Sequence, residues 1–205
     1  YKRIMKTTIF ARILLLLTTL LASWQVVVGI DDAGFLPLVA YTIAFGVLLV
    51  ACLLLIILGL DILESPIVVI VSTIIPLSLS LGLVWEHWLP LRIPYLVFTI
   101  LGLLAVILTR LLPIKSKLPT LVIALVHGIA GLAIFLLPLV LSLTGRASPG
   151  FSLVGLGGAL IGVGGLLLSF LKAGHPILSR ETILKVLPGL LLVMTIAFVI
   201  GFRLG

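Results

Sequence analysis

Long apolar stretches alternate with short polar breaks along the whole chain. The hydrocarbon core of a bilayer is about 30 Å thick, and a helix needs about 20 apolar residues to cross it. Seven stretches of about this length cover residues 9–30, 36–60, 66–84, 93–112, 119–143, 150–171 and 183–202. The pattern predicts an all-α polytopic integral membrane bundle of about seven transmembrane helices. Because the breaks are short, we expect antiparallel neighbours and a single transmembrane domain over residues 1–205.

Several breaks carry signals that start a helix. Ser65-Pro66 and Ser148-Pro149 each place a capping serine before a proline at the first helical position. Ser179 precedes an acidic first turn at Glu181, so the last helix is expected to begin about a turn before its apolar stretch. The break between the second and third stretches holds acidic residues and no basic ones. A single broken helix is therefore the alternative at that point.

The basic residues indicate an orientation in the membrane. With the N-terminus in the cytoplasm, ten lie on the inner side: Lys2, Arg3, Lys6, Arg12, Arg110, Lys115, Lys117, Lys172, Arg180 and Lys185. Three lie outside: Arg92, Arg146 and Arg203. Cytoplasmic loops are enriched in lysine and arginine, so the bias predicts a cytoplasmic N-terminus and an external C-terminus. Trp24, Trp85 and Trp88 then fall towards the outer interface, where tryptophan is common.

Composition agrees with a lipid environment. The chain is 62% hydrophobic and 9% charged, whereas a soluble domain carries about 25% charged residues. The net charge of +7 comes from residues at the edges of apolar stretches, which suits contacts with lipid headgroups. A basic patch with interleaved aromatics is lacking, so nucleic acid is not an expected partner. Cys52 is the single cysteine, which excludes an intrachain disulfide and a four-cysteine metal site.

Seven glycines lie between Gly150 and Gly165. They fit neither the dinucleotide-binding nor the P-loop pattern, since the third glycine of G-x-G-x-x-G and the lysine of G-K-[ST] are both lacking. Steps of three and four instead place small residues on one helix face: Gly155, Gly158, Gly162, Gly165 and Ser169, with Gly158-x-x-x-Gly162 inside the run. Such a seam lets membrane helices approach closely. A candidate partner seam lies in the preceding stretch, at Thr120, Ala124, Gly128 and Gly131, although either seam could face another subunit.

His127 is the clearest ionisable residue inside a predicted span. It lies about eight residues from the cytoplasmic end, or about 12 Å deep at about 1.5 Å per residue. Intramembrane ionisable groups point to function, but a histidine bonded to a neighbouring carbonyl or hydroxyl is the simplest interpretation. The alternatives are contact with a quinone or a lipid, and haem ligation with Met194 as the conceivable second ligand. Bound lipids are expected in any case.

The other polar residues suggest structural roles. Glu86-His87 reads as an interfacial turn between belt tryptophans, and Asp61 with Glu64 as a solvated turn. Pro76 and a second proline at 138 predict kinks, with hydroxyls near the first that could line a small polar cavity. A catalytic set and a metal-binding motif are not apparent, so neither an enzyme nor a metal site is expected.

These observations favour an accessory or structural subunit of a larger membrane complex of the respiratory or photosynthetic type. Its partners would be membrane lipids and other membrane protein subunits, bound through lipid-embedded helix faces. The membrane would be the cell inner membrane or an internal energy-transducing membrane. The alternatives are a small uncoupled transporter or channel, and a membrane anchor that contacts quinone or haem through His127.

Overall fold

The structure is a computed structural model that describes residues 8–31, 33–112, 116–172 and 178–205; the side chains of residues 61, 64, 66, 166 and 168–172 are not described. Within these ranges the chain forms α1 (Ile9–Val28), α2 (Phe35–Leu58), α3 (Pro66–His87), α4 (Arg92–Leu111), α5 (Leu118–Leu143), α6 (Ser152–Lys172) and α7 (Arg180–Arg203). Six are long and apolar enough to cross a membrane, and a shorter apolar helix covers Pro149–Gly165. The predicted all-α, multi-pass membrane bundle is confirmed.

The helix boundaries follow the predicted stretches with one clear difference, at the end of α3, and two predictions about the breaks are confirmed. α3 continues through His87 instead of ending at residue 84, because the first proline after it is Pro90. α7 begins at Arg180, where the Ser179 hydroxyl accepts a hydrogen bond from the Thr182 amide at 3.1 Å. α2 and α3 are separate helices: Gly59, at φ +82°, ends α2 and leads into the 3-10 helix η1 (Leu60–Glu64).

The side-chain caps predicted at Ser65 and Ser148 do not form. The Ser148 hydroxyl instead donates to the carbonyl of Leu204 and so links the start of the 3-10 helix η3 (Pro149–Phe151) to the end of the chain. Proline still occupies the first position of α3 and of η3, where its missing amide proton removes no helical hydrogen bond.

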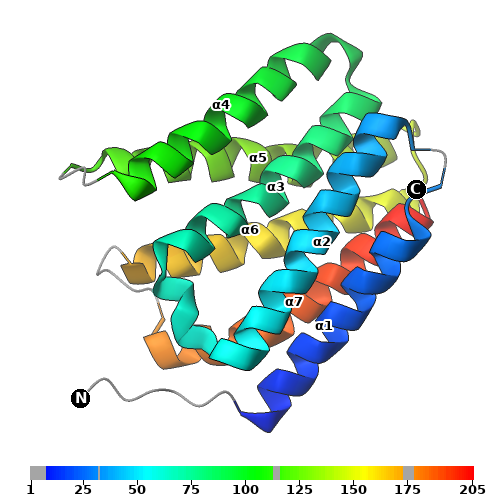
Figure 1. The fold of residues 1–205 in the computed structure, drawn as a ribbon. Coiled ribbons are helices and arrows are strands. Elements are labelled where there is room, and N and C mark those ends of the chain that lie inside the picture. The colour runs from blue at the N-terminus through cyan, green and yellow to red at the C-terminus, as the bar shows by residue number, and fades with distance from the viewer. Residues whose placement is uncertain (1–7, 32, 113–115, 173–177) are drawn as a thin grey trace, which may run out of the picture.

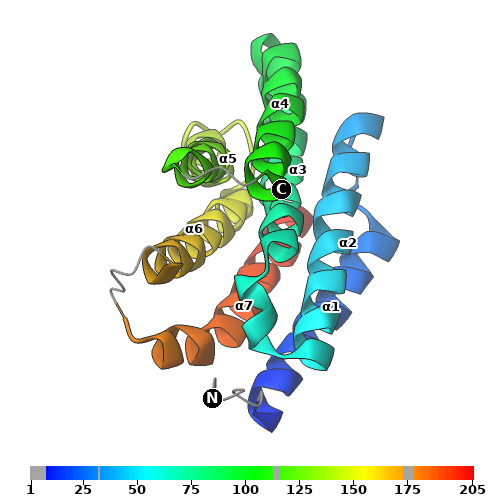
Figure 2. The same ribbon diagram turned by 60° about the vertical axis from the view of Figure 1, so that its left-hand side comes forward.

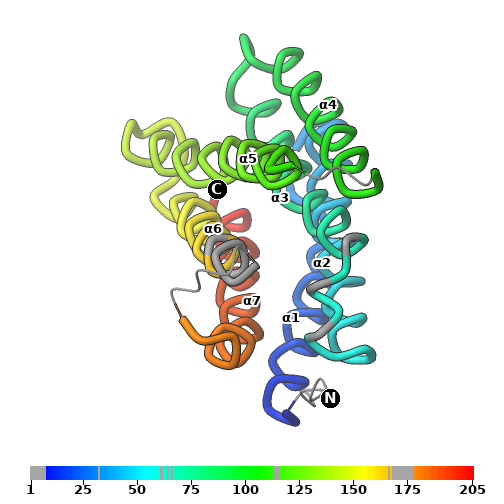
Figure 3. Tube along the Cα trace, turned by 90° about the vertical axis from the view of Figure 1, so that its left-hand side faces the viewer, coloured from blue at the N-terminus to red at the C-terminus, as the bar shows by residue number. Residues whose placement is uncertain are grey.

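Six helices close into a ring, with α4 outside it. Contacts run α1–α2, α2–α3, α3–α5, α5–α6, α6–α7 and back from α7 to α1, whereas α4 packs against α3 and α5. Figures 2 and 3 show α6 and α7 on one side of the bundle and α1 and α2 on the other. In Figure 3, α5 crosses above the space between these two groups.

The main core cluster fills the inside of this ring. All six ring helices contribute, through buried residues that include Leu15, Phe45, Leu79, Ile134, Val154 and Phe198. α4 contributes instead to two smaller clusters that it forms with α3 and α5, one around Val106 and one around Tyr95. A cavity between α2, α3 and α7, lined by Ala44, Phe45, Leu48, Ile75, Leu79 and Phe198, has a volume of only about 10 Å³. That is about the space of a single water molecule.

The start of α1 and the end of α7 lie on opposite sides of the bundle (Figure 1). We call the side where α1 begins the N-terminal end, and the side where α7 finishes the C-terminal end. The loops that join α1 to α2, α3 to α4 and α5 to α6 lie at the C-terminal end, as do Trp24, Trp85 and Trp88. Which end faces the cytoplasm stays a prediction from the basic residues.

Two glycines of the ring predict opposite effects of an alanine substitution on the stability of the protein. A Cβ added at Gly158 of α6 would lie 2.7 Å from the Ile134 side chain and 3.0 Å from the α5 backbone, whereas one added at Gly46 of α2 meets nothing within 4 Å. We expect Gly158→Ala to destabilise the protein by about 1–3 kcal/mol through overpacking. Gly46→Ala should be neutral or stabilise it by up to about 1 kcal/mol through helix propensity. Thermal unfolding in detergent measures both; equal effects would contradict the close packing of α6 on α5.

Candidate functional site

His127 lies half-buried on α5 and bonds to its own helix. Its Nδ1 atom is 3.2 Å from the carbonyl oxygen of Ile123, one turn earlier. Arg110, in the last turn of α4, is close enough to act on the His127 ring electrostatically. Met194 of α7 belongs to the main core cluster and is fully buried. Quinone contact and haem ligation by His127 stay predictions.

The predicted small-residue seam divides into two halves. In the half nearer the C-terminal end, Gly155 and Gly158 pack on α5: a Cβ at Gly155 would lie 2.7 Å from the Phe135 carbonyl oxygen. In the other half, a Cβ at Gly162 or Gly165 would meet nothing within 4 Å. The Ser169 side chain lies outside the described part of the structure.

The candidate partner seam on α5 has no close neighbour either. A Cβ at Gly128 or Gly131 would also meet nothing within 4 Å. Thr120 and Ala124, on the same face, are exposed. The structure therefore brings Gly155 and Gly158 against Ile134 and Phe135 of α5 and does not bring the two predicted seams together.

A second face of α6 with glycines packs against α7. A Cβ at Gly157 would lie 2.7 Å from the Phe198 ring, and one at Gly164 would lie 2.9 Å from Leu190. From the other side, Gly201 of α7 admits the backbone of Val154, which would lie 2.6 Å from a Cβ there. Sequence reasoning missed this face. The seven-residue spacing of Gly157 and Gly164, about two helical turns, is the signal that could have revealed it.

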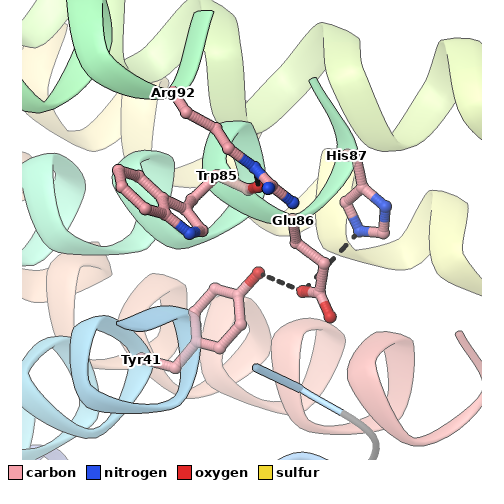
Figure 4. A network of polar contacts seen from close by, with 5 residues as sticks. All are labelled: Tyr41, Trp85, Glu86, His87 and Arg92. Atoms are coloured by element: carbon pink, nitrogen blue, oxygen red, sulfur yellow. Dashed lines mark hydrogen bonds and ion pairs between the residues drawn. The ribbon is translucent and has the colours of Figure 1, made fainter. Parts of the chain in front are cut away.

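The C-terminal end holds a set of polar contacts that the sequence analysis did not assemble (Figure 4). The Tyr41 hydroxyl of α2 donates a hydrogen bond of 2.9 Å to Oε2 of Glu86, in the last turn of α3. Tyr41 is 1% exposed. Its position depends on Gly82, one turn before Glu86, because a Cβ there would lie 2.4 Å from the Tyr41 ring.

His87 completes this set from the neighbouring position. Its Nε2 atom is 3.8 Å from Oε2 of Glu86, and the two side chains are 27% and 26% exposed. The His87 ring packs edge-on against Phe151 of η3, with 5.2 Å between ring centroids. The Tyr41 ring contacts Phe202 of α7 at 4.8 Å. Residues from α2, α3, η3 and α7 therefore meet around one carboxylate.

Glu86-His87 is thus not the interfacial turn that the sequence predicted. Both residues are helical, and Glu86 bonds to a buried tyrosine on another helix. The signal that could have revealed this contact is the position of each residue along its helix. Tyr41 lies about two turns into α2 and Glu86 lies in the last turn of α3, so both are near the same end of two antiparallel neighbours. Hydropathy alone could not reveal it, since it gives no rotation of one helix about another.

Two arginines of this end have partners of their own. Arg92 donates through Nε to the carbonyl of Trp85 and lies over the Trp85 ring, 5.7 Å from its centroid. Arg203 pairs with Asp31 at 2.8 Å and lies over the ring of Trp24. Each guanidinium thus combines a hydrogen bond or ion pair with a cation–π contact. Among the residues that the structure describes, three or more His, Cys, Asp or Glu side chains do not gather as a metal site would require.

Comparison with known proteins adds no assignment to this geometry. No protein-family model matches the chain, and searches of curated proteins and of solved structures find no match.

Tyr41 and Tyr95 are both buried near the C-terminal end of the bundle, and they predict contrasting effects of a change to phenylalanine. Tyr41→Phe removes the hydrogen bond to Glu86 and should destabilise the protein by about 1 kcal/mol, since the acceptor is charged but partly hydrated. The Tyr95 hydroxyl of α4 has no hydrogen-bond partner among the described residues, and the nearby Ser80 hydroxyl donates to carbonyls of its own helix. Tyr95→Phe should therefore be neutral or slightly stabilising. Thermal unfolding of both variants checks this; a larger loss for Tyr95→Phe would contradict it.

Proposed function

We propose that this protein is an accessory subunit of a larger membrane complex and that it binds a transmembrane helix of another subunit. The contact would be what we call the open seam: Ala124, Gly128 and Gly131 of α5 with Gly162 and Gly165 of α6. The supporting observation is that small residues continue both faces of the α5–α6 contact into a region where a Cβ added at the glycines would meet nothing within 4 Å.

Helical periodicity places both sides of the open seam on the contact faces. Gly162 follows Gly155 by seven residues, about two turns, and Gly165 follows Gly158 by the same interval. The two earlier glycines pack directly on α5. On α5, Gly128 precedes Phe135 by seven residues, and Phe135 is one of the residues that α6 contacts. The glycines of the open seam therefore face the space between α5 and α6, where none has a neighbour within 4 Å of a Cβ position.

The way in which helices associate in a membrane would give the glycines of the open seam a function. Lipid tails are as apolar as leucine, so helices associate in a bilayer by close packing of small residues and not by hydrophobic burial. Each glycine also costs a helix about 1 kcal/mol relative to alanine. Gly155 and Gly158 offset this cost through contacts with α5. The glycines of the open seam have no such contact within the chain, and a helix from another subunit would supply it.

The burial of the helices also favours lateral association at this side. α4 and α5 are each only 17% buried in their apolar windows, compared with 56% for α3. Large apolar side chains on the surface of α5 include Leu121, Leu125, Leu132 and Leu136. Such side chains flank the small residues of α5, as expected for a helix whose small-residue face packs on a neighbour and whose flanks contact lipid.

The alternative of a small transporter or channel has less support from the geometry. The cavity that Phe45, Leu79 and Phe198 line between α2, α3 and α7 has a volume of only about 10 Å³. This space admits about one water molecule and is lined by apolar side chains.

We propose the cell inner membrane or an internal energy-transducing membrane as the location, because such membranes house complexes of many small subunits.

Leucine substitutions test the open seam. Gly128→Leu combined with Gly131→Leu should block the approach of another helix and reduce the share of the protein in the larger complex at least about tenfold, equivalent to about 1.4 kcal/mol. Gly46→Leu on α2 is the matched control, since Gly46 is also helical with nothing within 4 Å of its Cβ position. The measurement is the particle size of the tagged protein after mild solubilisation of its own membrane.

Three results are distinguishable. A large particle for the wild type and Gly46→Leu, but not for the double variant, supports the proposal. A small particle for all three proteins shows that the chain acts alone and contradicts it. A particle containing only copies of this chain shows that the open seam binds a second copy, which contradicts the accessory role.

A further inference from the structure

Glu86 lies at the end of its span, beside the packed interior. Its side chain is 26% exposed and belongs to the last turn of α3, at the C-terminal end. On its inner side it accepts the hydrogen bond from Tyr41, which is 1% exposed. This hydrogen bond therefore links a partly exposed carboxylate to a buried side chain of another helix.

Among the residues that the structure describes, no lysine or arginine pairs with Glu86. α2 contributes Tyr41, and the neighbouring position on α3 contributes His87, whose charge itself depends on pH. Aromatic rings face the set from η3 and α7. Among the charged groups of the adjoining segments, Arg92, Asp31 and Arg203 have the partners described above, and Arg146, in the turn before η3, does not pair with Glu86.

Protonation would change both contacts that Glu86 makes. An ionised carboxylate accepts hydrogen bonds only, and its bond from Tyr41 is charge-assisted; a neutral acid accepts a weaker one. His87, once protonated, pairs with the ionised carboxylate at 3.8 Å. When Glu86 is neutral, the His87 cation loses this partner while its ring still lies against Phe151. The link from α3 to α2 therefore weakens, while the contact of the His87 ring with η3 remains.

We propose that Glu86 is a proton-binding site: when ionised it holds α2 against α3 at the C-terminal end, and when protonated it loosens this contact. The placement is specific because Gly82 admits the Tyr41 ring against α3 at a distance that any side chain would prevent. The inference does not rest on the open seam, whose glycines on α6 lie in the half of that helix farther from the C-terminal end of the bundle.

Infrared difference spectroscopy of the purified protein tests proton binding directly. A change from about pH 8 to about pH 3.5 spans the ordinary titration ranges of histidine and glutamate. The carbonyl stretch of a protonated carboxylic acid should appear at low pH. It should lose one component in Glu86→Gln and keep that component in Asp31→Asn, which removes another carboxylate of the same end. An unchanged band in Glu86→Gln overturns the proposal.

A stability cycle tests the coupling to α2 and remains informative if Glu86→Gln does not fold. The melting temperature of Tyr41→Phe should fall furthest below that of the wild type near pH 8, where the hydrogen bond is charge-assisted. The difference should shrink by at least about half near pH 3.5, because a neutral hydrogen bond contributes about half as much. Tyr95→Phe should show no such pH dependence, because the Tyr95 hydroxyl has no hydrogen-bond partner among the described residues. A Tyr41→Phe deficit that stays constant with pH overturns the proposal.

Discussion

The close approach of α6 to two neighbours is the contact on which the rest of the bundle depends. Gly155 and Gly158 admit α5 on one face, and Gly157 and Gly164 admit side chains of α7 on the other. In lipid, apolar side chains gain little from leaving the solvent, so packing at short range has to hold the helices together. A helix with glycine on two faces can be tightly packed on both sides, and α6 thereby joins α5 to α7 and closes the ring.

Closure of the ring explains the distribution of the apolar residues. The neighbouring helices supply the large side chains that pack against these glycines. Phe198 of α7 lies against Gly157, and Ile134 of α5 lies against Gly158. These residues belong to the main core cluster, together with residues of the other ring helices. α4 has no place in that interior, so it packs on the outside of α3 and α5 and leaves most of its surface to lipid.

Polar groups within the bundle follow two different rules. Thr19, Thr73 and Thr195 are buried and each donates to a carbonyl four residues earlier in its own helix. Such bonds satisfy the hydroxyl without linking one helix to another. Tyr41 and Glu86 instead bond across two helices at the C-terminal end, where one partner is partly exposed. This cross-helix hydrogen bond therefore lies at the end of a span and not at its centre.

The sequence by itself determined the number of apolar helices, their approximate ends and the helical class, because each membrane helix must satisfy its own backbone hydrogen bonds and so reveals its length in the hydropathy. It also identified Gly155 and Gly158 as members of a small-residue face. The tertiary structure decided which neighbour each glycine meets, why Gly128 and Gly162 remain apart, why α4 lies outside the ring, and that Tyr41 reaches Glu86. These outcomes depend on the rotation and crossing of helices, which side-chain packing sets and which an apolar pattern on nearly every face does not encode.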